Sequence, residues 1–396
     1  MARTVRKIAL MAVGDDGWQG GIQYISNILN ALDAIAVDPH LEVHLLRHSR
    51  QNFRNLASLK NIRIIEHDTE KVFQPWSFPN KVKWKLQRKF QGRLNPRVEE
   101  YLLGLGVDFA FPSTLSYCGG KLNSAGWIAD FQYHHFPNGA RPDINADARR
   151  VIGRIAETSD KVVLSSLFCE QDCLQLFPIT RGRTHVMPFA VAIPAEDLAF
   201  RDFGAIADHY LIPRRFLMVA NIFAPTKDHA TLFEALGILR AKGIEVPLIC
   251  TGNIVDYRNE HFANEVLQML TLHRIRSQVH LLGLVPRDHQ LALFRMAVAI
   301  VQPSLNEGWS TSVEEAKALG KHLLVSDIPV HKEQCPDNPF MFPASQAKEL
   351  ADRIERVWIA TAGTEFPELD KEAQAHLAYQ EKVREFGHRF MEIASA

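Results

Sequence analysis

Apolar and polar positions alternate along this chain in a repeated rhythm of short and long segments. Short runs rich in β-branched and other apolar residues are separated by longer segments that carry apolar residues at helical spacing. The short runs are typical of buried strands, and the long segments are typical of helices that cover a parallel sheet. The pattern therefore predicts repeated strand–helix–strand units and an α/β fold.

The predicted strands form two groups. Those of the first half are 8–13, 42–47, 62–66, 107–111, 126–129, 162–165 and 185–189, and those of the second half are 216–221, 247–251, 279–284, 298–302 and 323–326. Each group suffices for one doubly wound parallel sheet, so we expect two facing Rossmann-like domains with a cleft between them. Ligands of such sheets bind beyond the carboxyl ends of the strands.

Helices are expected between the strands. One begins after Gly20-Gly21 and runs through Leu32. The others are expected at 147–158, 167–176, 228–242, 260–272, 287–296, 312–319, 345–358 and 379–393. The stretch 192–213 has no long periodic run and is interpreted as the link between the domains.

The length of 396 residues also favours two domains. We place the N-terminal domain at 1–200 and the C-terminal domain at 205–375. In the terminal helix, Val383, Phe386 and Phe390 recur at helical spacing and need a partner surface. We therefore expect residues 376–396 to pack back on the N-terminal domain.

Charge and cysteine content narrow the function classes. The 45 basic and 45 acidic residues balance, so bulk charge predicts no nucleic-acid partner. Five cysteines without a paired pattern favour a reducing compartment. The first apolar run, 8–13, is too short for a signal peptide, and no run approaches the roughly 20 residues that span a bilayer. We expect a cytoplasmic protein.

The richest motif follows the predicted strand 298–302 and opens a helix. It reads Gln-Pro-Ser-Leu-Asn-Glu-Gly-Trp-Ser-Thr-Ser-Val-Glu-Glu over 302–315. Gly308 lets a backbone approach a ligand closely. Ser310, Thr311 and Ser312 suit a helix start, whose amides and positive dipole end can bind a diphosphate. Glu307 in the loop can hold sugar hydroxyls, and Glu315 in the first turn can hold ribose hydroxyls.

The pair Glu307 and Glu315 forms a Glu-x7-Glu element, and with it the chain resembles the retaining glycosyltransferases of family 4, which have the GT-B fold. The segment 219–229 resembles the donor-phosphate loop of that family, 280–287 resembles its base-binding turn, and 320–333 resembles the strand region after the Glu-x7-Glu helix. The resemblance is strong over 215–333 and weaker over the first half.

The resemblance implies a donor site in the C-terminal domain. Lys227 would stabilise the negative charge that builds on a departing nucleoside diphosphate. Gly283 and Leu284 would lie in the base-binding turn, and Trp309 would belong to the same donor site. Family members often carry an arginine where this chain has Asn221, so one cation is exchanged for a neutral hydrogen-bonding group.

The first domain supplies two further candidate segments. Gly20 and Gly21 resemble the family's glycine loop near the donor phosphates. Asp130-Phe131-Gln132-Tyr133-His134-His135 follows the predicted strand 126–129 and should face the cleft. A histidine of the family stands near the transferred sugar at this point. We favour His134 for that role, with Asp130 and His135 as alternatives.

The resemblance implies same-face attack, in which the departing phosphate takes the acceptor proton and His134 orients the sugar. The chain contains no Asp-x-Asp motif. We therefore expect no bound metal and no cofactor, with a nucleoside-diphosphate sugar as co-substrate. The acceptor would be a saccharide or a lipid-linked saccharide, and the expected setting is the synthesis of a surface polysaccharide or lipopolysaccharide.

The stretch 81–97 reads KVKWKLQRKFQGRLNPR and contains no acid. Val82, Leu86, Phe90 and Leu94 recur every fourth residue and give one apolar stripe between basic positions. This pattern suits an anionic membrane surface, and it equally suits a helix that packs on the first domain. A peripheral location on the inner face of the membrane follows from the first interpretation.

Two other functions fit parts of the pattern. A sugar-nucleotide epimerase on the same fold is one, although the intact Glu-x7-Glu element disfavours it. A catalytically silent sugar-nucleotide-binding protein is the other. It is favoured by Asn221 and by Tyr133, which stands where some relatives that read Asp-Phe-Gln-His have the histidine. A nicotinamide-dependent dehydrogenase is disfavoured because no Gly-x-Gly-x-x-Gly follows the first strand.

Overall fold

The computed structural model describes residues 5–14, 19–36, 41–72, 96–113, 121–255 and 262–396. The chain divides into two compact units. Unit 1 comprises Met1–Phe131, Ala146–Ala192 and Glu381–Ala396, and unit 2 comprises Gln132–Asn145 and Ile193–Gln380. The basic stretch 81–97 and Cys118 lie outside the described residues, apart from residues 96 and 97 at the start of a helix.

Unit 1 is built on a parallel sheet with strand order β3-β2-β1-β4-β5-β6-β7. Its strands are β1 (Lys7–Met11), β2 (Glu42–Arg47), β3 (Arg63–Asp68), β4 (Phe109–Ser113), β5 (Ser124–Ile128), β6 (Lys161–Leu164) and β7 (Thr184–Val186). The order reverses between β1 and β4, as in a doubly wound sheet. Every strand that the apolar runs predict in this half is present, with ends displaced by up to three residues.

The helices of unit 1 depart from the prediction at their starts. Those helices are α1 (Gln19–Ile35), α2 (Thr69–Val72), α4 (Pro96–Gly104), α6 (Pro142–Thr158, which belongs to unit 1 from Ala146 onward) and α7 (Leu167–Leu176), with short turns at Leu56–Ser58 and Pro178–Thr180. The start expected after Gly20-Gly21 is wrong, because α1 begins at Gln19. The start expected at 147 is also wrong, because Pro142 opens α6 and proline is tolerated in a first helical turn.

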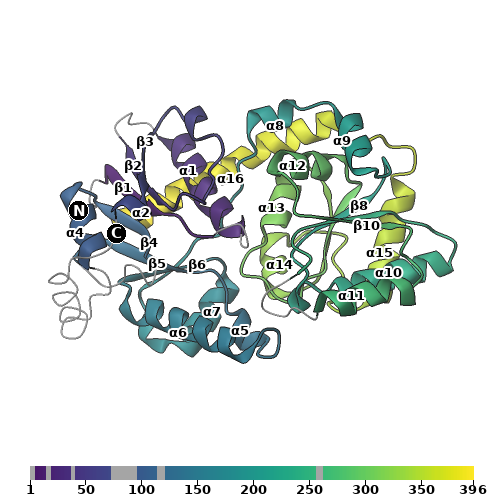
Figure 1. Ribbon diagram of the computed structural model, residues 1–396, viewed down its shortest axis with the longest axis horizontal. Helices are drawn as coiled ribbons and strands as arrows, with labels where there is room; N and C mark the ends of the chain where they lie inside the picture. The colour runs from purple at the N-terminus through teal and green to yellow at the C-terminus, as the bar shows by residue number, and fades with distance from the viewer. Residues whose placement is uncertain (1–4, 15–18, 37–40, 73–95, 114–120, 256–261) are drawn as a thin grey trace. The chain divides into compact units, whose positions relative to one another are not determined.

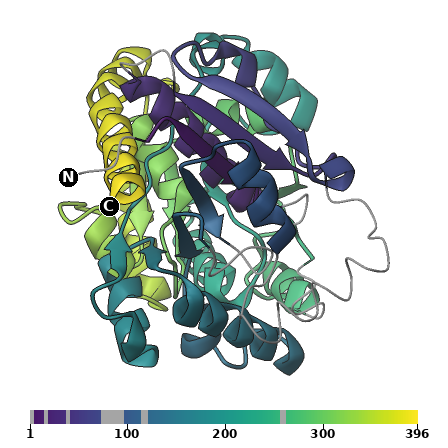
Figure 2. The same cartoon turned by 90° about the vertical axis from the view of Figure 1, so that its left-hand side faces the viewer.

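The last turns of α16 (Leu369–Ser395) belong to unit 1. Phe390 packs edge-on against Phe109 and Phe111, with ring centroids 5.8 and 5.4 Å apart. At Gly387 a Cβ would come within 2.5 Å of the Ala31 carbonyl oxygen, so α16 and α1 approach backbone to backbone (Figure 2). Lys161 also donates to the carbonyl of Ile393 at 2.9 Å. The apolar stripe of this helix therefore completes the core of unit 1.

Unit 2 holds a second parallel sheet with strand order β10-β9-β8-β11-β12. Its strands are β8 (Leu217–Ala220), β9 (Leu248–Thr251), β10 (Val279–Gly283), β11 (Ala299–Gln302) and β12 (His322–Val325). Again the order reverses beside the first strand, between β8 and β11. Both units are thus doubly wound parallel sheets, which confirms the predicted fold class.

Helices cover both faces of the second sheet (Figure 1). One face carries α10 (His229–Ala241), α11 (Phe262–Leu272) and α15 (Ala347–Ala360). The other face carries α12 (Arg287–Met296), α13 (Thr311–Ala318) and α14 (Pro329–Gln334). Short elements complete the unit: α5 (Gln132–His135), α8 (Ala195–Ala199), α9 (Phe203–Tyr210) and a 3-10 turn at Pro225–Lys227.

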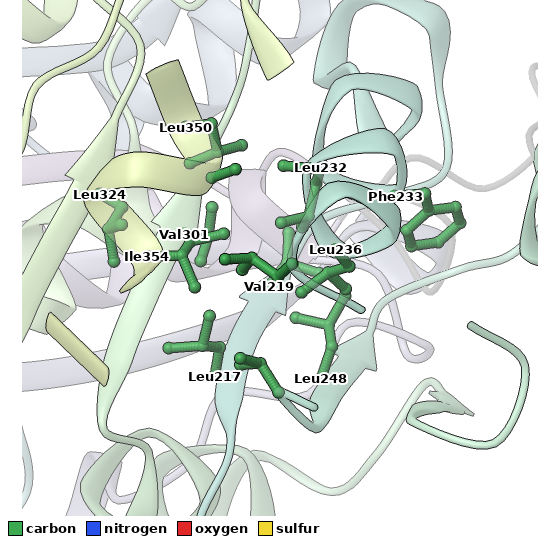
Figure 3. Close-up of a cluster of buried hydrophobic side chains, with 14 of the residues drawn as sticks. Leu217, Val219, Leu232, Phe233, Leu236, Leu248, Val301, Leu324, Leu350 and Ile354 are labelled. Carbon is green, nitrogen blue, oxygen red and sulfur yellow. The ribbon is translucent and has the colours of Figure 1, made fainter. Parts of the chain in front are cut away.

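The core of unit 2 lies between its sheet and the layer of α10 and α15. Leu217, Val219 and Val301 on the strands meet Leu232 and Leu236 of α10 in a cluster of fully buried side chains. Leu350 and Ile354 of α15 close the cluster on its other side (Figure 3). The residues of this cluster are all apolar, so the cluster supports the strands whose ends carry the polar loops.

The stretch 192–213 is not an irregular link. It contains α8 and α9, and both pack against α12 within unit 2. The buried Arg295 of α12 fixes them, because its Nη1 donates to the carbonyls of Asp197 and Phe200 at 2.7 and 3.0 Å. The boundary between the units does fall at the start of this stretch, between Ala192 and Ile193, but the rest of the stretch belongs to unit 2. Its helices were not predicted because they are too short to show a periodic pattern.

Two further boundaries differ from the sequence-based placement. Helix α16 begins at Leu369 rather than 379, and it passes from unit 2 to unit 1 between Gln380 and Glu381. Residues 132–145 group with unit 2 although they lie within the first half of the chain.

Over the described part of the chain, no helix combines the length and the apolarity that crossing a bilayer requires.

Candidate active site

The reversal of strand order between β8 and β11 places two loops side by side at one edge of the second sheet. The loop after β8 runs from Asn221 to the 3-10 turn Pro225–Lys227, and the loop after β11 runs from Pro303 to Ser310. The amide of Leu305 donates to the carbonyl of Thr226 at 2.8 Å, so the two loops are bonded to each other. Parallel sheets bind their ligands at this kind of position.

Lys227 and Glu307 meet between these loops. The Lys227 ammonium lies 2.5 Å from Oε1 of Glu307. The side chains are 19% and 8% exposed, respectively. The Coulomb attraction within a pair this well shielded from water exceeds that within a surface pair, although burial of both charges costs desolvation energy. Removal of Lys227 would leave a buried carboxylate without its cation. The structure thus brings together two of the residues that the sequence assigns to the donor site.

Buried amides complete the surroundings of Glu307. Nε2 of Gln302, the last residue of β11, donates to the same Oε1 at 2.8 Å. Oε1 of Gln302 accepts from Nδ2 of Asn221 at 2.9 Å. Ser304 is fully buried beside them and accepts from Gln302 at 3.2 Å. Asn221 therefore does not stand alone in place of the family's arginine but is half of a pair of side-chain amides.

Electrostatics keeps Glu307 ionised. Burial by itself would raise the pKa of this carboxyl, but Lys227, His331 and Ser304 together hold its pKa below the ordinary value. His331 of α14 is fully buried, and burial lowers its pKa to about 4, so the imidazole is neutral near pH 7. Its Nδ1 lies 2.9 Å from the carbonyl of Ser326, which fixes the proton on Nδ1.

Helix α13 begins beside the same loops. Ser310 occupies the N-cap position, and its amide donates to Oε1 of Gln334 at 3.3 Å. The Ser312 hydroxyl donates to the carbonyl of Ala220 at 3.0 Å and ties α13 to the end of β8. Thr311 opens the helix, while Gly308 is buried and Trp309 is half-buried in the loop before it. An anion at this helix start would share the Ser310 amide with Gln334.

Glu315 is only 1% exposed, so it is not the surface acid that an isolated helix would show. Its Oε1 pairs with Nη2 of Arg287, the first residue of α12. Nη1 of Arg287 lies 3.3 Å from Oε1 of Gln290, which steadies the guanidinium. A ribose that binds to Glu315 would therefore meet a carboxylate already held in place by a cation.

The turn after β10 carries the predicted base-binding residues. Gly283 has φ +69, a conformation that favours glycine, and Leu284 is 60% exposed. The amide of Gly252, after β9, donates to the carbonyl of Gly283 at 2.9 Å. A Cβ on Gly252 would lie 2.3 Å from the Asn221 carbonyl oxygen. Gly252 thus links the predicted base-binding turn to the start of the predicted donor-phosphate loop.

The candidates in unit 1 have different positions from those expected. Gly20 and Gly21 lie inside the first turn of α1 and not in a loop before it. A Cβ on Gly21 would come within 2.8 Å of the backbone of Val13 and Gly14. Gly21 is therefore required for close packing of the helix start against the end of the first strand.

The segment after β5 divides between the units. Asp130 is half-buried and belongs to unit 1, whereas His134 and His135 lie in the short helix α5, grouped with unit 2. His134 is exposed, and its ring packs edge-on against that of His135, with centroids 5.2 Å apart. The choice among Asp130, His134 and His135 stays a prediction.

Sequence reasoning missed Gln302, Arg287 and Gln334. Gln302 carries a signal that could have identified it, because it is a polar residue at the end of an otherwise apolar strand. Arg287 and Gln334 contact the motif from distant segments, and no spacing rule predicts such contacts. Over the described ranges, no group of three or more histidine, cysteine, aspartate or glutamate residues is arranged to hold a metal ion.

Comparison with known proteins adds a domain match and distant relatives. Residues 208–361 match the model of the glycosyl transferases group 1. The serotype-specific mannosyltransferase WbdA of Escherichia coli is 23% identical over 207 residues, which are 50% of this chain. The match covers 24% of WbdA, so this chain spans about a quarter of the length of the curated relatives it matches.

Solved structures share the fold over nearly the whole chain. A glycosyltransferase from Rickettsia africae ESF-5 has a TM-score of 0.63 at 15% identity and covers 99% of this chain and 98% of its own. Anabaena HepE in complex with UDP and glucose has a TM-score of 0.63 at 14% identity, with coverages of 98% and 99%. Sucrose-phosphate synthase from Thermosynechococcus elongatus gives 0.61 at 16% identity, with coverages of 98% and 96%.

These likenesses confirm the predicted GT-B architecture. The domain match covers the whole segment that holds Lys227, Glu307 and Glu315.

Proposed function

We propose that this chain is a glycosyltransferase that moves a sugar from a nucleoside-diphosphate sugar to a saccharide or lipid-linked saccharide. The carrying observation is the Lys227–Glu307 pair at the point where the strand order of the second sheet reverses. A cation is held there beside a helix start, and an ionised acid lies next to it. This is the set of groups that a departing diphosphate and a sugar ring require.

Lys227 supplies the positive charge for the leaving group. The ammonium needs to move only from the Glu307 carboxylate to a phosphate oxygen, exchanging one anion for another. Since the donor brings its own negative charge, Lys227 remains paired throughout. In the same model, Glu307 accepts hydrogen bonds from hydroxyls of the transferred sugar and fixes the ring before transfer.

Glu315 binds the ribose of the donor in this proposal. Its carboxylate is buried and paired with Arg287, so it is oriented before a ligand arrives. Two adjacent ribose hydroxyls can donate to such an acid. The exposed Leu284 and the glycine turn at Gly283 offer an apolar surface and open backbone for the base.

The finer features of the reaction belong to the same proposal. Transfer proceeds with retention by same-face attack, in which the departing phosphate takes the acceptor proton and His134 orients the sugar. HepE was solved with UDP and glucose, which favours a UDP-sugar donor, while WbdA is a mannosyltransferase. The description of WbdA as serotype-specific supports a place in surface polysaccharide or lipopolysaccharide synthesis. A location on the inner face of the membrane is part of the same proposal and is motivated by the basic stretch 81–97.

The test joins ligand binding to product formation. A ligand that binds only the folded state at 100 times its Kd raises stability by about 2.7 kcal/mol. For a unit of this size, that corresponds to a rise in melting temperature of roughly 5–10 °C. The protein is screened with UDP-, GDP- and other nucleoside-diphosphate sugars, and any positive donor is then tested for transfer to saccharide acceptors.

Matched variants connect the result to the site. Glu315→Gln should abolish the thermal shift by the donor, whereas Glu349→Gln, on the exposed first turn of α15, should leave it intact. Lys227→Met should lower transfer by at least about a hundredfold, since removing one group that stabilises developing charge typically costs 10²–10³ in rate. Full transfer activity in both site variants would refute the assignment.

Asn221 favours one competing function, a silent sugar-nucleotide-binding protein. The side chain is neutral where family members often carry a cation, and it bonds to Gln302. A donor-induced thermal shift without transfer or donor hydrolysis would identify that function. An epimerase would instead produce an altered nucleotide sugar when no acceptor is present.

A further inference from the structure

Glu307 has two donors on one oxygen, and only one of them is free to leave. Lys227 approaches Oε1 on a long flexible side chain from the turn Pro225–Lys227. Gln302 approaches the same Oε1 from the end of a buried central strand, and its own side chain is fully buried. The proposed reaction requires Lys227 to move toward a diphosphate. During that move, Gln302 is the donor that stays.

The orientation of Gln302 is fixed by its neighbours. A carboxylate accepts hydrogen bonds and cannot donate them, so the Gln302 amide must turn its Nε2 toward Glu307. Its Oε1 then faces Asn221, whose Nδ2 donates to it at 2.9 Å. The charge on Glu307 therefore sets the orientation of Gln302, and Gln302 sets that of Asn221.

The energetic role follows from the burial of Glu307. A buried carboxylate that loses its cation becomes strongly unfavourable unless other hydrogen bonds remain. Gln302 and Ser304 supply those bonds. Without Gln302, departure of Lys227 would leave Glu307 with the Ser304 bond alone, so the carboxylate would rotate in its loop or take up a proton more readily.

We propose that Gln302, oriented by the charge of Glu307 and held by its hydrogen bond with Asn221, is a positioning residue that keeps Glu307 in its sugar-binding orientation while Lys227 transfers to the donor's diphosphate. This inference rests on the proposed glycosyltransferase function. The amide pair also gives Asn221 a role of its own at a position where an arginine would add a second cation beside Glu307.

The first experiment needs no enzymatic activity. Hydrogen exchange of the amides in β11 and its loop is measured for the wild type, Lys227→Met, Gln302→Met and the double variant. Each single variant leaves Glu307 with one strong donor, whereas the double variant removes both. Hydrogen exchange reports the equilibrium constant for local opening. We expect this constant to rise in the double variant roughly tenfold more than the product of the increases in the two single variants. Additive effects would overturn the proposal.

The second experiment measures kcat and KM for the donor. Gln302→Met should lower kcat by about tenfold or more, the size of a lost hydrogen bond to a charged group, with KM changed less than about threefold. In a Glu307→Ala background, the same substitution should cause no further loss of kcat. An equal loss in both backgrounds would show that Gln302 acts independently of Glu307 and would overturn the proposal.

Controls separate positioning from general stability. Gln278→Met replaces another buried glutamine of unit 2, just before β10, and should leave kcat and KM unchanged. If Gln302→Met does not fold, Gln302→Asn withdraws the amide by one methylene and should act in the same direction.

The two failures remain distinguishable. If hydrogen exchange is non-additive but the wild type transfers no sugar, the proposed glycosyltransferase activity is wrong, whereas the partnership of Gln302 and Glu307 is supported. Normal transfer with additive exchange overturns only the role of Gln302.

Discussion

His229, the first residue of α10, provides a quantitative test of the structure because its imidazole is fully buried. The side chain is 0% exposed, and neither ring nitrogen has a hydrogen-bond partner among the described residues. The ring stacks on Phe223 at a centroid distance of 4.1 Å and meets Phe233 edge-on. A phenylalanine fits this aromatic environment, so His229→Phe removes two unsatisfied polar atoms and retains the stacking.

The expected pH effect follows from the pKa of His229. Burial, assisted by the nearby charge of Lys227, lowers its pKa from 6.5 to about 3. The folded protein therefore excludes a proton that the unfolded chain binds. The contribution of the neutral His229 to the free energy of unfolding is complete above pH 6.5 and is lost progressively as the pH falls toward 3. At pH 5 the loss of folding stability is about 2 kcal/mol. In the unfolded chain at that pH, the protonated imidazole outnumbers the neutral form by a factor of roughly 30.

His331 adds to the same decrease of stability at low pH. Burial lowers its pKa to about 4, so it contributes a second loss of about 2 kcal/mol at pH 5. Between pH 8 and pH 5, these two histidines should cost the wild type about 4 kcal/mol, and His229→Phe should lose only about half of that. At pH 8, the variant should be more stable than the wild type by about 1–3 kcal/mol, the cost of leaving a buried polar group unsatisfied.

The assay is hydrogen exchange of peptides from β8 and α10 at pH 5 and pH 8, corrected for the intrinsic pH dependence of exchange. These peptides report the opening of unit 2 separately from unit 1. His209→Phe serves as the control, because His209 lies exposed at the end of α9 beside the ring of Tyr210. If His229→Phe and the wild type lost equal stability between the two pH values, the burial argument for His229 would be wrong.

Three further predictions test separate features. Transfer should persist in excess EDTA, because Lys227 and the start of α13 supply the positive charge; loss of activity on chelation, restored by added Mg²⁺, would contradict this. Gly252→Ala should destabilise unit 2 by at least about 2 kcal/mol in denaturant unfolding, because φ is +118 and a Cβ would meet the Asn221 carbonyl at 2.3 Å. The basic stretch 81–97 should bind liposomes that contain anionic lipid at low salt, and flotation without binding would leave only its packing interpretation.

The pattern of apolar residues was sufficient to predict the strands of both sheets, but it did not predict where the helices begin. Strands of both units lie close to their predicted positions because a buried strand must be apolar on both faces. Helix α16 extends ten residues before its predicted start, because Leu369 and Leu377 are exposed and give no amphipathic stripe there. The short helices α8 and α9 were missed for the same reason: their packing on Arg295 involves distant residues and not a local period.

The motifs Lys227 and Glu-x7-Glu were identifiable because their residue types and loop positions are local properties of the chain. The residues that these motifs contact could not be identified from the sequence. The sequence separates Lys227 from Glu307 and Arg287 from Glu315 by many residues, and only the strand order β8-β11 brings the first pair into one loop cluster.

The sequence by itself determined two α/β units and the order of the loops that carry charge, since burial and helical period are written into neighbouring residues. The tertiary structure alone decided which acid faces which cation, why Gln302 and Asn221 form an amide pair, and why Gly21 lies within a helix rather than in a ligand loop. These features depend on strand order and on backbone approaches between distant segments, and no local pattern encodes them.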